Sequence, residues 1–259
     1  MANNSARVRD KTDGRAVATN SAPVVDGTPI ENELLLNLPS GESDLIFPKL
    51  TFLPLRTHDI LHEPGEALKF GYFMNSGLAS VLNVMADGKS VEVGLTGKEG
   101  FVALPLLIGL GSSPNQTVIQ IAGSAFRIRA ADLIHALLRC PTLEKRMHRY
   151  VQTLAMQGSQ VAACNRLHEV DQRLARWLLM SQDRIGSATV PLTQEFLGHM
   201  LGTRRSSVTV SAGRLQKAGL ITYRRGSVQI ESRPGLLRAS CECYQSMERQ
   251  SKKWQSESQ

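Results

Sequence analysis

Short apolar runs separated by turn residues fill the stretch Phe52–Arg129 of the 259-residue sequence. The runs Leu78–Met85 and Ser90–Leu95 lie on either side of Asp87-Gly88. An Asp-Gly pair between two apolar runs is a strong signal for a β-hairpin, because glycine accepts the positive φ of a tight turn. The pattern predicts an antiparallel β domain over residues 31–140, in the form of a small barrel or roll.

Turn residues also mark both ends of this domain. The runs Val118–Ile121 and Ala125–Ile128 flank Gly123 and repeat the strand–turn–strand pattern. At the other end we expect a short helix over Ile30–Leu38, terminated by the Pro-Ser-Gly sequence that follows it.

The period of the apolar positions lengthens after Ala130. A short helix is predicted over Ala131–Arg139 and a long one over Thr142–His168. Alternate steps of four and three along the long helix fall on a narrow, mostly apolar stripe, which is typical of a seam between two helices. We therefore interpret residues 141–169 as a dimerisation helix with the contact residues Leu143, Met147, Tyr150, Leu154, Val161 and Cys164. The alternative is that this helix packs on its own β domain.

A helix-turn-helix followed by a wing is predicted after a further helix over Val170–Asp183. Thr193 caps a short helix, and Gly202 permits the left-handed backbone that ends it and redirects the chain. A second helix runs from about residue 204 to Lys217, and two short β segments joined by a basic turn complete the unit. In such a unit the N-terminal part of the second helix enters the major groove of DNA.

The charge supports a polyanionic partner. The whole chain carries a formal charge of +7, and the 46 residues Thr193–Arg238 hold eight basic and two acidic residues, a net charge of +6. Such a concentration on one small unit suits the neutralisation of phosphates, so we expect double-stranded DNA as the partner. An arginine can pair with both O6 and N7 of guanine. The candidate DNA contacts are Thr193, Arg204, Arg205, Ser206, Ser207, Thr209, Val210, Arg214, Arg224 and Arg225.

With these residues in place, the sequence resembles the Crp/Fnr family of bacterial transcription regulators over about residues 34–245. The resemblance implies an α+β fold with an N-terminal β-roll like a cyclic-nucleotide-binding domain, a long dimerisation helix and a C-terminal winged helix-turn-helix. It also implies a homodimer on a palindromic operator, with RNA polymerase as a further candidate partner. Arg205 matches the family's base-reading arginine and Thr193 its phosphate-contacting threonine. Ser206 and Val210 stand where the family often has Glu and Arg, so its usual half-site is not assumed.

The sensor departs from the cofactor-binding members of that family. Cyclic-nucleotide sites there use a Gly-Glu pair and a following Arg, whereas Gly100–Leu107 and Ser112–Val118 contain neither Glu nor Arg. Burying a phosphate without a countercharge is costly, so cyclic AMP is not expected. An N-terminal cysteine cluster for iron–sulfur chemistry is absent, since the first cysteine is Cys140. His58 and His62 are read as surface or turn residues rather than haem or metal ligands. The effector stays unknown.

The expected division is a disordered tail (1–30), the β-roll sensor (31–140), the dimerisation helix (141–169), the winged helix-turn-helix (170–240) and a C-terminal tail (241–259). We expect a cytoplasmic protein with reduced cysteines, because no apolar run is long enough for a membrane span or a secretory signal. Cys241 and Cys243 form an isolated Cys-x-Cys, and no metal site is expected. No constellation of residues indicates an enzyme. The alternative to DNA binding is an adaptor whose winged helix binds another protein.

Overall fold

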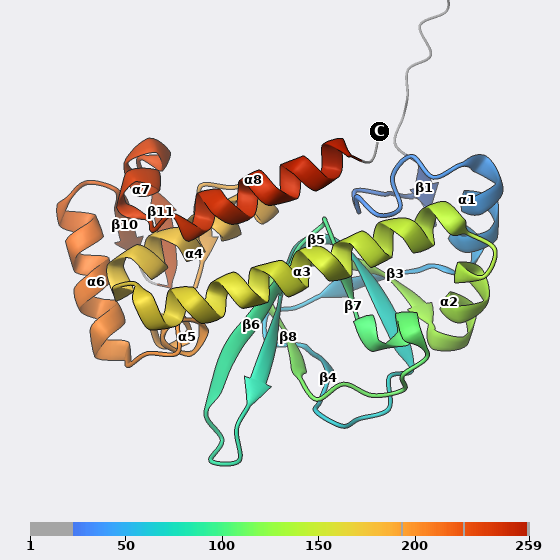
Figure 1. The fold of residues 1–259 in the computed structure, drawn as a ribbon, viewed down its shortest axis with the longest axis horizontal. Coiled ribbons are helices and arrows are strands. Elements are labelled where there is room, and N and C mark those ends of the chain that lie inside the picture. Colours follow the sequence, from blue (N-terminus) through green and yellow to red (C-terminus); the bar gives the residue numbers. More distant parts are fainter. Residues whose placement is uncertain (1–22, 193, 225, 258–259) are drawn as a thin grey trace, which may run out of the picture.

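The computed structural model describes residues 23–192, 194–224 and 226–257. A β domain lies at one end of the molecule and a helical domain with a small sheet at the other, and one long helix runs along both (Figure 1). The elements before this helix are β1 Val24–Val25, β2 Thr28–Pro29, α1 Ser40–Ile46, η1 Phe47–Lys49, β3 Thr51–Leu55, β4 Ile60–His62, β5 Phe70–Val84, β6 Ser90–Thr96, β7 Phe101–Val102, η2 Leu104–Ile108, β8 Gln116–Arg129 and α2 Ala130–Leu137. The remainder are α3 Pro141–Leu167, α4 Val170–Ile185, β9 Thr189–Pro191, α5 Gln194–Met200, α6 Arg205–Lys217, β10 Ile221–Arg224, β11 Ser227–Ile230, α7 Arg233–Ala239 and α8 Cys243–Ser256.

The sensor is the antiparallel sheet that the sequence predicts. Its strands are ordered β3-β8-β5-β6, with β4 paired to β8 and β7 paired to β5. The predicted hairpin is confirmed: Val84 pairs with Ser90, and Gly88 takes the positive φ of 79° in the connecting turn. The strand order and the β5–β6 hairpin thus agree with the predicted antiparallel β domain.

Gly123 does not mark a turn, as the strand–turn–strand reading expected. It lies inside the single long strand β8, beside a bulge of β5 at Ser76. A Cβ atom on Gly123 would collide with the backbone carbonyl of Ser76. Glycine is required here because the two backbones approach closely. In a sequence, a glycine needed for this reason looks the same as a glycine needed for a turn.

The N-terminal expectations need correction where the structure describes them. Residues 1–22 of the predicted tail lie outside the described residues, but Val24–Val25 and Thr28–Pro29 form a hairpin. Val25 and Ile30 are buried in the sensor core, so this segment belongs to the domain.

The expected helix over residues 30–38 is also absent, and α1 begins directly after Pro39 instead. Hydrogen bonds of side-chain amides hold residues 30–38 in a non-helical conformation. The side chain of Asn75 accepts from the backbone N–H of Glu31 (2.7 Å), and that of Asn32 donates to the Gly100 carbonyl (2.8 Å). Proline is well tolerated at the start of a helix, because the first N–H groups of a helix have no partner within it. Pro39 therefore precedes a helix instead of ending one, as the sequence analysis had expected.

The long helix α3 agrees with the predicted bounds to within one residue at each end, but most of the predicted seam is buried within the chain. Leu143, Met147 and Tyr150 are buried in the core of their own sensor, and Cys164 is buried near the other end of the helix. The Tyr150 hydroxyl donates to Thr96 (2.9 Å). The alternative interpretation, a helix packed on its own β domain, is therefore right for Leu143, Met147 and Tyr150, whereas Cys164 packs against Cys241 and Cys243. Leu154 and Val161 are half-buried.

Helix α4 joins the sensor to the helix-turn-helix. Every residue from Arg173 to Ser181 is buried, and one hydrophobic cluster extends from Leu95 of the sensor sheet through Trp177 to Leu197 of α5. The Trp177 indole donates to the carboxylate of Glu92 on β6 (2.9 Å). The two domains thus share one core.

The expected C-terminal tail is a helix. In Figure 1, α8 lies beside α3 and runs in the opposite direction, and Tyr244 and Met247 are buried at its N-terminal half. Apolar residues four and three apart in this segment supply a face that packs on the rest of the chain.

Glu92 makes stability depend on pH. Burial raises its pKa to about 7, against hydrogen bonds from Ser80 and Trp177 that favour the carboxylate. Because the pKa of Glu92 is higher in the folded protein than in the unfolded chain, its protonated form stabilises the fold. This contribution is fully present below the unfolded-state pKa and is lost as the pH rises through about 7. Between about pH 5 and about pH 8 we expect the free energy of unfolding of the wild type to fall by up to about 3 kcal/mol relative to Glu92→Gln. Urea unfolding at several pH values measures this, with the exposed Glu144→Gln as control; parallel pH profiles for all three proteins would contradict it.

Candidate nucleic-acid interface

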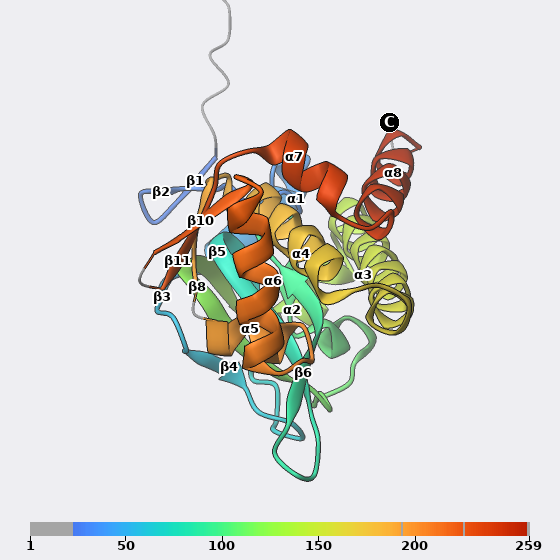
Figure 2. The ribbon, with the colours of Figure 1, turned by 90° about the vertical axis from the view of Figure 1, so that its left-hand side faces the viewer.

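Helix α6 presents a polar face to solvent at one end of the molecule. Val208, Ala212 and Leu215 are buried, while Arg205 and Thr209 on the opposite face are exposed. Figure 2 shows α6 in front of the rest of the domain. The 3.6-residue period predicted these two faces, and the structure confirms them.

The start of α6 carries most of the predicted contact residues. Arg204 is the N-cap residue, with extended backbone (φ −70°, ψ 144°), and its carbonyl accepts from the N–H of Ser207 (3.0 Å). Arg204, Arg205 and Ser206 are exposed, and Ser207 is half-buried. Neither arginine forms an ion pair among the side chains that the structure describes. Their charge is available to an anion.

Val210 is an apolar side chain on this polar face. It is 54% exposed, next to Thr209 and one turn from Ser206. Apolar side chains at such positions can contact the methyl group of thymine in the major groove. Its exposure agrees with the predicted outward orientation.

Arg214 differs from the other predicted contacts, because it already has a partner. Its guanidinium forms an ion pair with Asp171 of α4 (3.0 Å), and Ser211 donates to the other oxygen of that carboxylate (2.5 Å). These contacts brace α6 against α4. Arg214 therefore positions the helix rather than offering an unpaired charge.

The turn between α5 and α6 is the one that the sequence predicts. Gly202 has a φ of 56°, and the N–H of Thr203 donates to the Gly198 carbonyl (2.9 Å). Leu197 and Met200 of α5 and Leu201, which follows it, are buried in the same core as the inward face of α6. This packing sets the angle at which α6 stands on the domain.

The wing is a hairpin of β10 and β11, extended by β9 to three strands. Arg224 is exposed near its tip, where Gly226 has a φ of 81°. The Tyr223 hydroxyl donates to the Leu192 carbonyl (3.1 Å) and ties the wing to the segment before α5. The predicted contacts Thr193 and Arg225 lie outside the described residues.

The sensor region that binds phosphate in cyclic-nucleotide domains is apolar here. Phe101, Val102, Ala103 and Leu106 are buried in the cores of the sensor. His62 is buried as well, and its Nε2 lies 3.0 Å from the Thr117 hydroxyl, so its reading as a surface residue is wrong.

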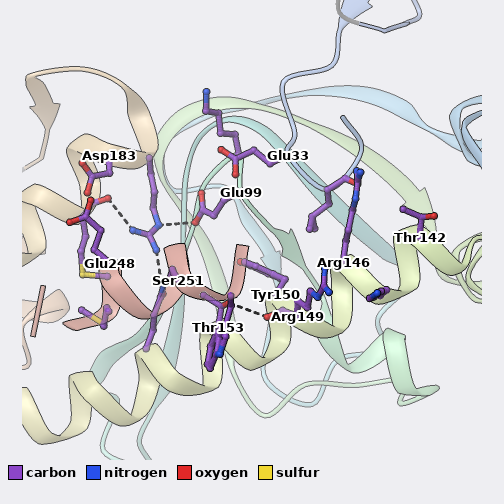
Figure 3. A pocket seen from close by; sticks show the side chains of 18 of the residues that line it. Glu33, Glu99, Thr142, Arg146, Arg149, Tyr150, Thr153, Asp183, Glu248 and Ser251 are labelled. Carbon is purple, nitrogen blue, oxygen red and sulfur yellow. Dashed lines mark hydrogen bonds and ion pairs between the residues drawn. The ribbon is translucent and has the colours of Figure 1, made fainter. Parts of the chain in front are cut away.

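A groove of about 940 Å³ lies between the sensor edge, α3, α4 and α8 (Figure 3). Arg149 and Thr153 of α3 line it with Glu33 and Glu99 of the sensor and Glu248 of α8. Arg184 of α4 donates from Nε to Glu99 (2.8 Å) within it. This ion pair links the sensor directly to the DNA-binding domain.

The structure also brings together three cysteines and a histidine. The sequence analysis, which expected no metal site, did not predict this cluster. The ligand atoms of Cys164, His168, Cys241 and Cys243 all lie within 4.8 Å of one another. A hydrogen bond between the Cys164 and Cys241 thiols lowers the pKa of Cys164 and raises that of Cys241. The available signal was a Cys and a His four apart on one helix together with a Cys-x-Cys. Nothing in the sequence showed that these two halves meet.

Comparisons with known proteins agree with this geometry. Residues 172–239 match the family described as the Crp-like helix-turn-helix domain. Among solved structures, the c-di-GMP-responsive global regulator CLP of Xanthomonas campestris is 16% identical, with a TM-score of 0.63 over 75% of this chain and 100% of the other. FixK2 of Bradyrhizobium japonicum is 14% identical, with a TM-score of 0.65 over 74% and 98%. A CRP-family transcriptional regulator of Thermus thermophilus is 19% identical, with a TM-score of 0.60 over 73% and 96%. A search of curated proteins found no match.

These matches confirm the resemblance drawn from the sequence. Residues 172–239 are a Crp-like helix-turn-helix domain, and the described chain has the fold of the Crp/Fnr transcription regulators, with a cyclic-nucleotide-binding-like N-terminal domain. Two of these matched structures, CLP and the Thermus thermophilus protein, are described as regulators. None of the described helices is both long and apolar enough for a membrane span.

Arg205 provides the test of this interface. Arg205→Ala removes an exposed charge from the start of α6 and leaves the buried face intact, so we expect specific DNA binding to weaken by about 10-fold or more. Electrophoretic mobility shift at fixed salt measures the change. Arg139→Ala, an exposed arginine at the far end of the sensor, is the matched control. Equal affinity of both variants for the specific site would contradict the assignment.

Proposed function

We propose that this protein is a transcription regulator that binds double-stranded DNA in a sequence-specific manner, as a homodimer on a palindromic operator. The observation that carries the proposal is the exposed start of α6, with the unpaired Arg204 and Arg205, next to the basic wing at Arg224. Arginine on a recognition helix can read guanine, while arginine on a wing contacts phosphate. Contact with RNA polymerase is the further step that such a regulator implies.

The dimer uses α3, but by a different face from the one that the sequence favoured. Val151, Ala155, Ser159 and Ala162 are exposed at steps of three and four along the middle of the helix. Small side chains let two helices approach closely, and a two-fold axis through this stripe places the same residues of both copies in contact. The two copies of α6 then face successive turns of one duplex.

The sensor controls this dimer through packing and ion pairs. The shared core around Trp177 and the Arg184–Glu99 pair connect the sensor sheet to α4, on which α6 rests. A signal that moves the sheet relative to α3 changes how the recognition helices are presented. The apolar surroundings of Phe101 and Leu106 support an effector other than cyclic AMP. The proposal includes neither haem nor an iron–sulfur cluster.

Selection of bound duplexes from a random pool tests the function. We expect an inverted repeat with half-site centres about one helical turn apart, and binding that weakens steeply as salt rises. Recovery of sequences without a common motif would contradict sequence-specific binding. Recovery of a single half-site would contradict the dimer.

Ala155→Glu tests the dimer face directly. A carboxylate at the centre of a close helix–helix contact would be buried opposite its symmetry mate, so we expect dissociation into monomers. Analytical ultracentrifugation measures the mass, and Ala131→Glu on the exposed side of α2 makes the same change away from α3. A mutant that stays as dimeric as this control would place the interface elsewhere.

A further inference from the structure

Two segments far apart in the sequence meet where α3 ends. Cys164 lies in the last turn of α3 and His168 is its C-cap, while Cys243 is the first residue of α8 and Cys241 lies two residues before it. The three cysteines are at most 2% exposed. The Sγ atoms of Cys164 and Cys241 are 3.5 Å apart, and Sγ of Cys243 lies 3.6 Å from Nδ1 of His168.

We propose that these four residues bind one Zn²⁺ ion in a closed, structural Cys₃His site. For a tetrahedral ion with bonds of about 2.3 Å to sulfur and about 2.0 Å to nitrogen, two sulfurs lie about 3.8 Å apart, and a sulfur and a nitrogen about 3.5 Å apart. The two distances above lie close to these edges, and no two ligand atoms of the cluster are more than 4.8 Å apart. Three thiolates and one imidazole in tetrahedral arrangement favour Zn²⁺ among the common divalent metals.

The surrounding polar groups are arranged as they are around known metal ligands. Nε2 of His168 lies 3.2 Å from the carboxylate of Glu242, which orients the ring so that Nδ1 faces the cysteines. The amide of Gln160 donates to Sγ of Cys243 (3.1 Å). A carboxylate on the outer nitrogen and a donor to a thiolate both fix ligand orientation and raise metal affinity.

Charge gives an independent argument for an anionic centre at this place. Arg173 and Arg176 of α4 are only 7% and 3% exposed, and Nε of each has no hydrogen-bond partner in the described part of the chain. Neither forms an ion pair with a described carboxylate, but Arg173 and Arg176 both interact electrostatically with the cysteines of the cluster. Zn²⁺ with three thiolates carries one net negative charge. The site would therefore supply negative charge beside both buried guanidinium groups, of which Arg176 also interacts electrostatically with Glu92.

The geometry disfavours the two other uses of clustered cysteines. A disulfide requires a sulfur–sulfur distance of about 2.05 Å, whereas the Sγ atoms of Cys164 and Cys241 are 3.5 Å apart. Each sulfur also has the other three ligand atoms of the cluster within 4.8 Å, and not one partner alone. A cluster of several iron atoms needs space for its bridging sulfides, whereas ligand atoms within 4.8 Å of one another enclose a single ion.

The bound ion would join the end of α3 to the start of α8. His168 is the C-cap of α3 and Glu169 the N-cap of α4, so the ion lies at the junction between the long helix and the DNA-binding domain. Four protein ligands leave no open coordination position, which is the pattern of structural zinc. Its role is to hold this junction and α8 in place.

The test is metal binding by the full-length, reduced protein. Elemental analysis of protein purified without added chelator should find one Zn²⁺ per chain. Replacement by Co²⁺ should give the thiolate charge-transfer and intense d–d absorption of a tetrahedral site. Cys164→Ser and Cys243→Ser should each lose most of the bound metal, whereas Cys140→Ser, which changes a buried sensor cysteine, should retain it. Removal of the metal should lower the melting temperature of the wild type by several degrees and leave the two site variants unchanged.

Three results would overturn the proposal. The folded, reduced wild type could fail to bind Zn²⁺ or Co²⁺, an outcome that requires no variant to fold. The Cys140→Ser protein could lose the metal as fully as the site variants. Mass spectrometry could show a Cys164–Cys241 disulfide in freshly purified protein that binds no metal after reduction, which would assign the cluster to redox chemistry instead.

Discussion

The complete burial of α4 is the constraint on which the rest of the molecule depends. A helix whose residues Arg173–Ser181 are all shielded from water must be covered on every side, and the sensor sheet, α6, α7 and α8 all pack against it. Trp177 lies at the centre of this packing. Its indole N–H must find an acceptor once it is buried, and the acceptor is Glu92 of the sensor. The position of the DNA-binding domain relative to the sensor therefore follows from covering one helix.

The same burial places charged groups where charge is costly. Glu92, Arg173 and Arg176 are each less than a tenth exposed. Isolated charges in such surroundings are stabilised only by hydrogen bonds or by a charge of opposite sign. Glu92 has its hydrogen bonds, and its proton affinity rises nonetheless. The two arginines face a group of thiols, and a metal–thiolate centre there would balance them. The chemistry of the interior is thus a consequence of how tightly α4 is enclosed.

The proposed DNA-binding surface follows the opposite rule. Arg204, Arg205 and Arg224 are exposed and form no ion pair with a described side chain, whereas Arg214 is held by Asp171 and fixes the helix that carries Arg205. Separate residues thus position the recognition helix and supply free charge. A rigid helix with free charges at its start suits base recognition, because little order remains to be created on binding.

The sequence by itself determined most of the helices and the residues of the proposed DNA-binding face. Apolar periodicity predicted α2, α3, α4 and α6. Gly202 correctly marked the turn between α5 and α6, and Asp87-Gly88 that between β5 and β6, because these signals depend on local backbone geometry. Only the tertiary structure decided which side of α3 is covered, that α4 is buried on all sides, and that α8 is a packed helix. Heptad steps and the 3.6-residue period differ too little within one helix to tell a dimer seam from a core face. Cys164 and Cys241 are 77 positions apart, and only the folding of α8 back along α3 brings them together. Such long-range contacts depend on how the whole chain packs, and no local pattern records them.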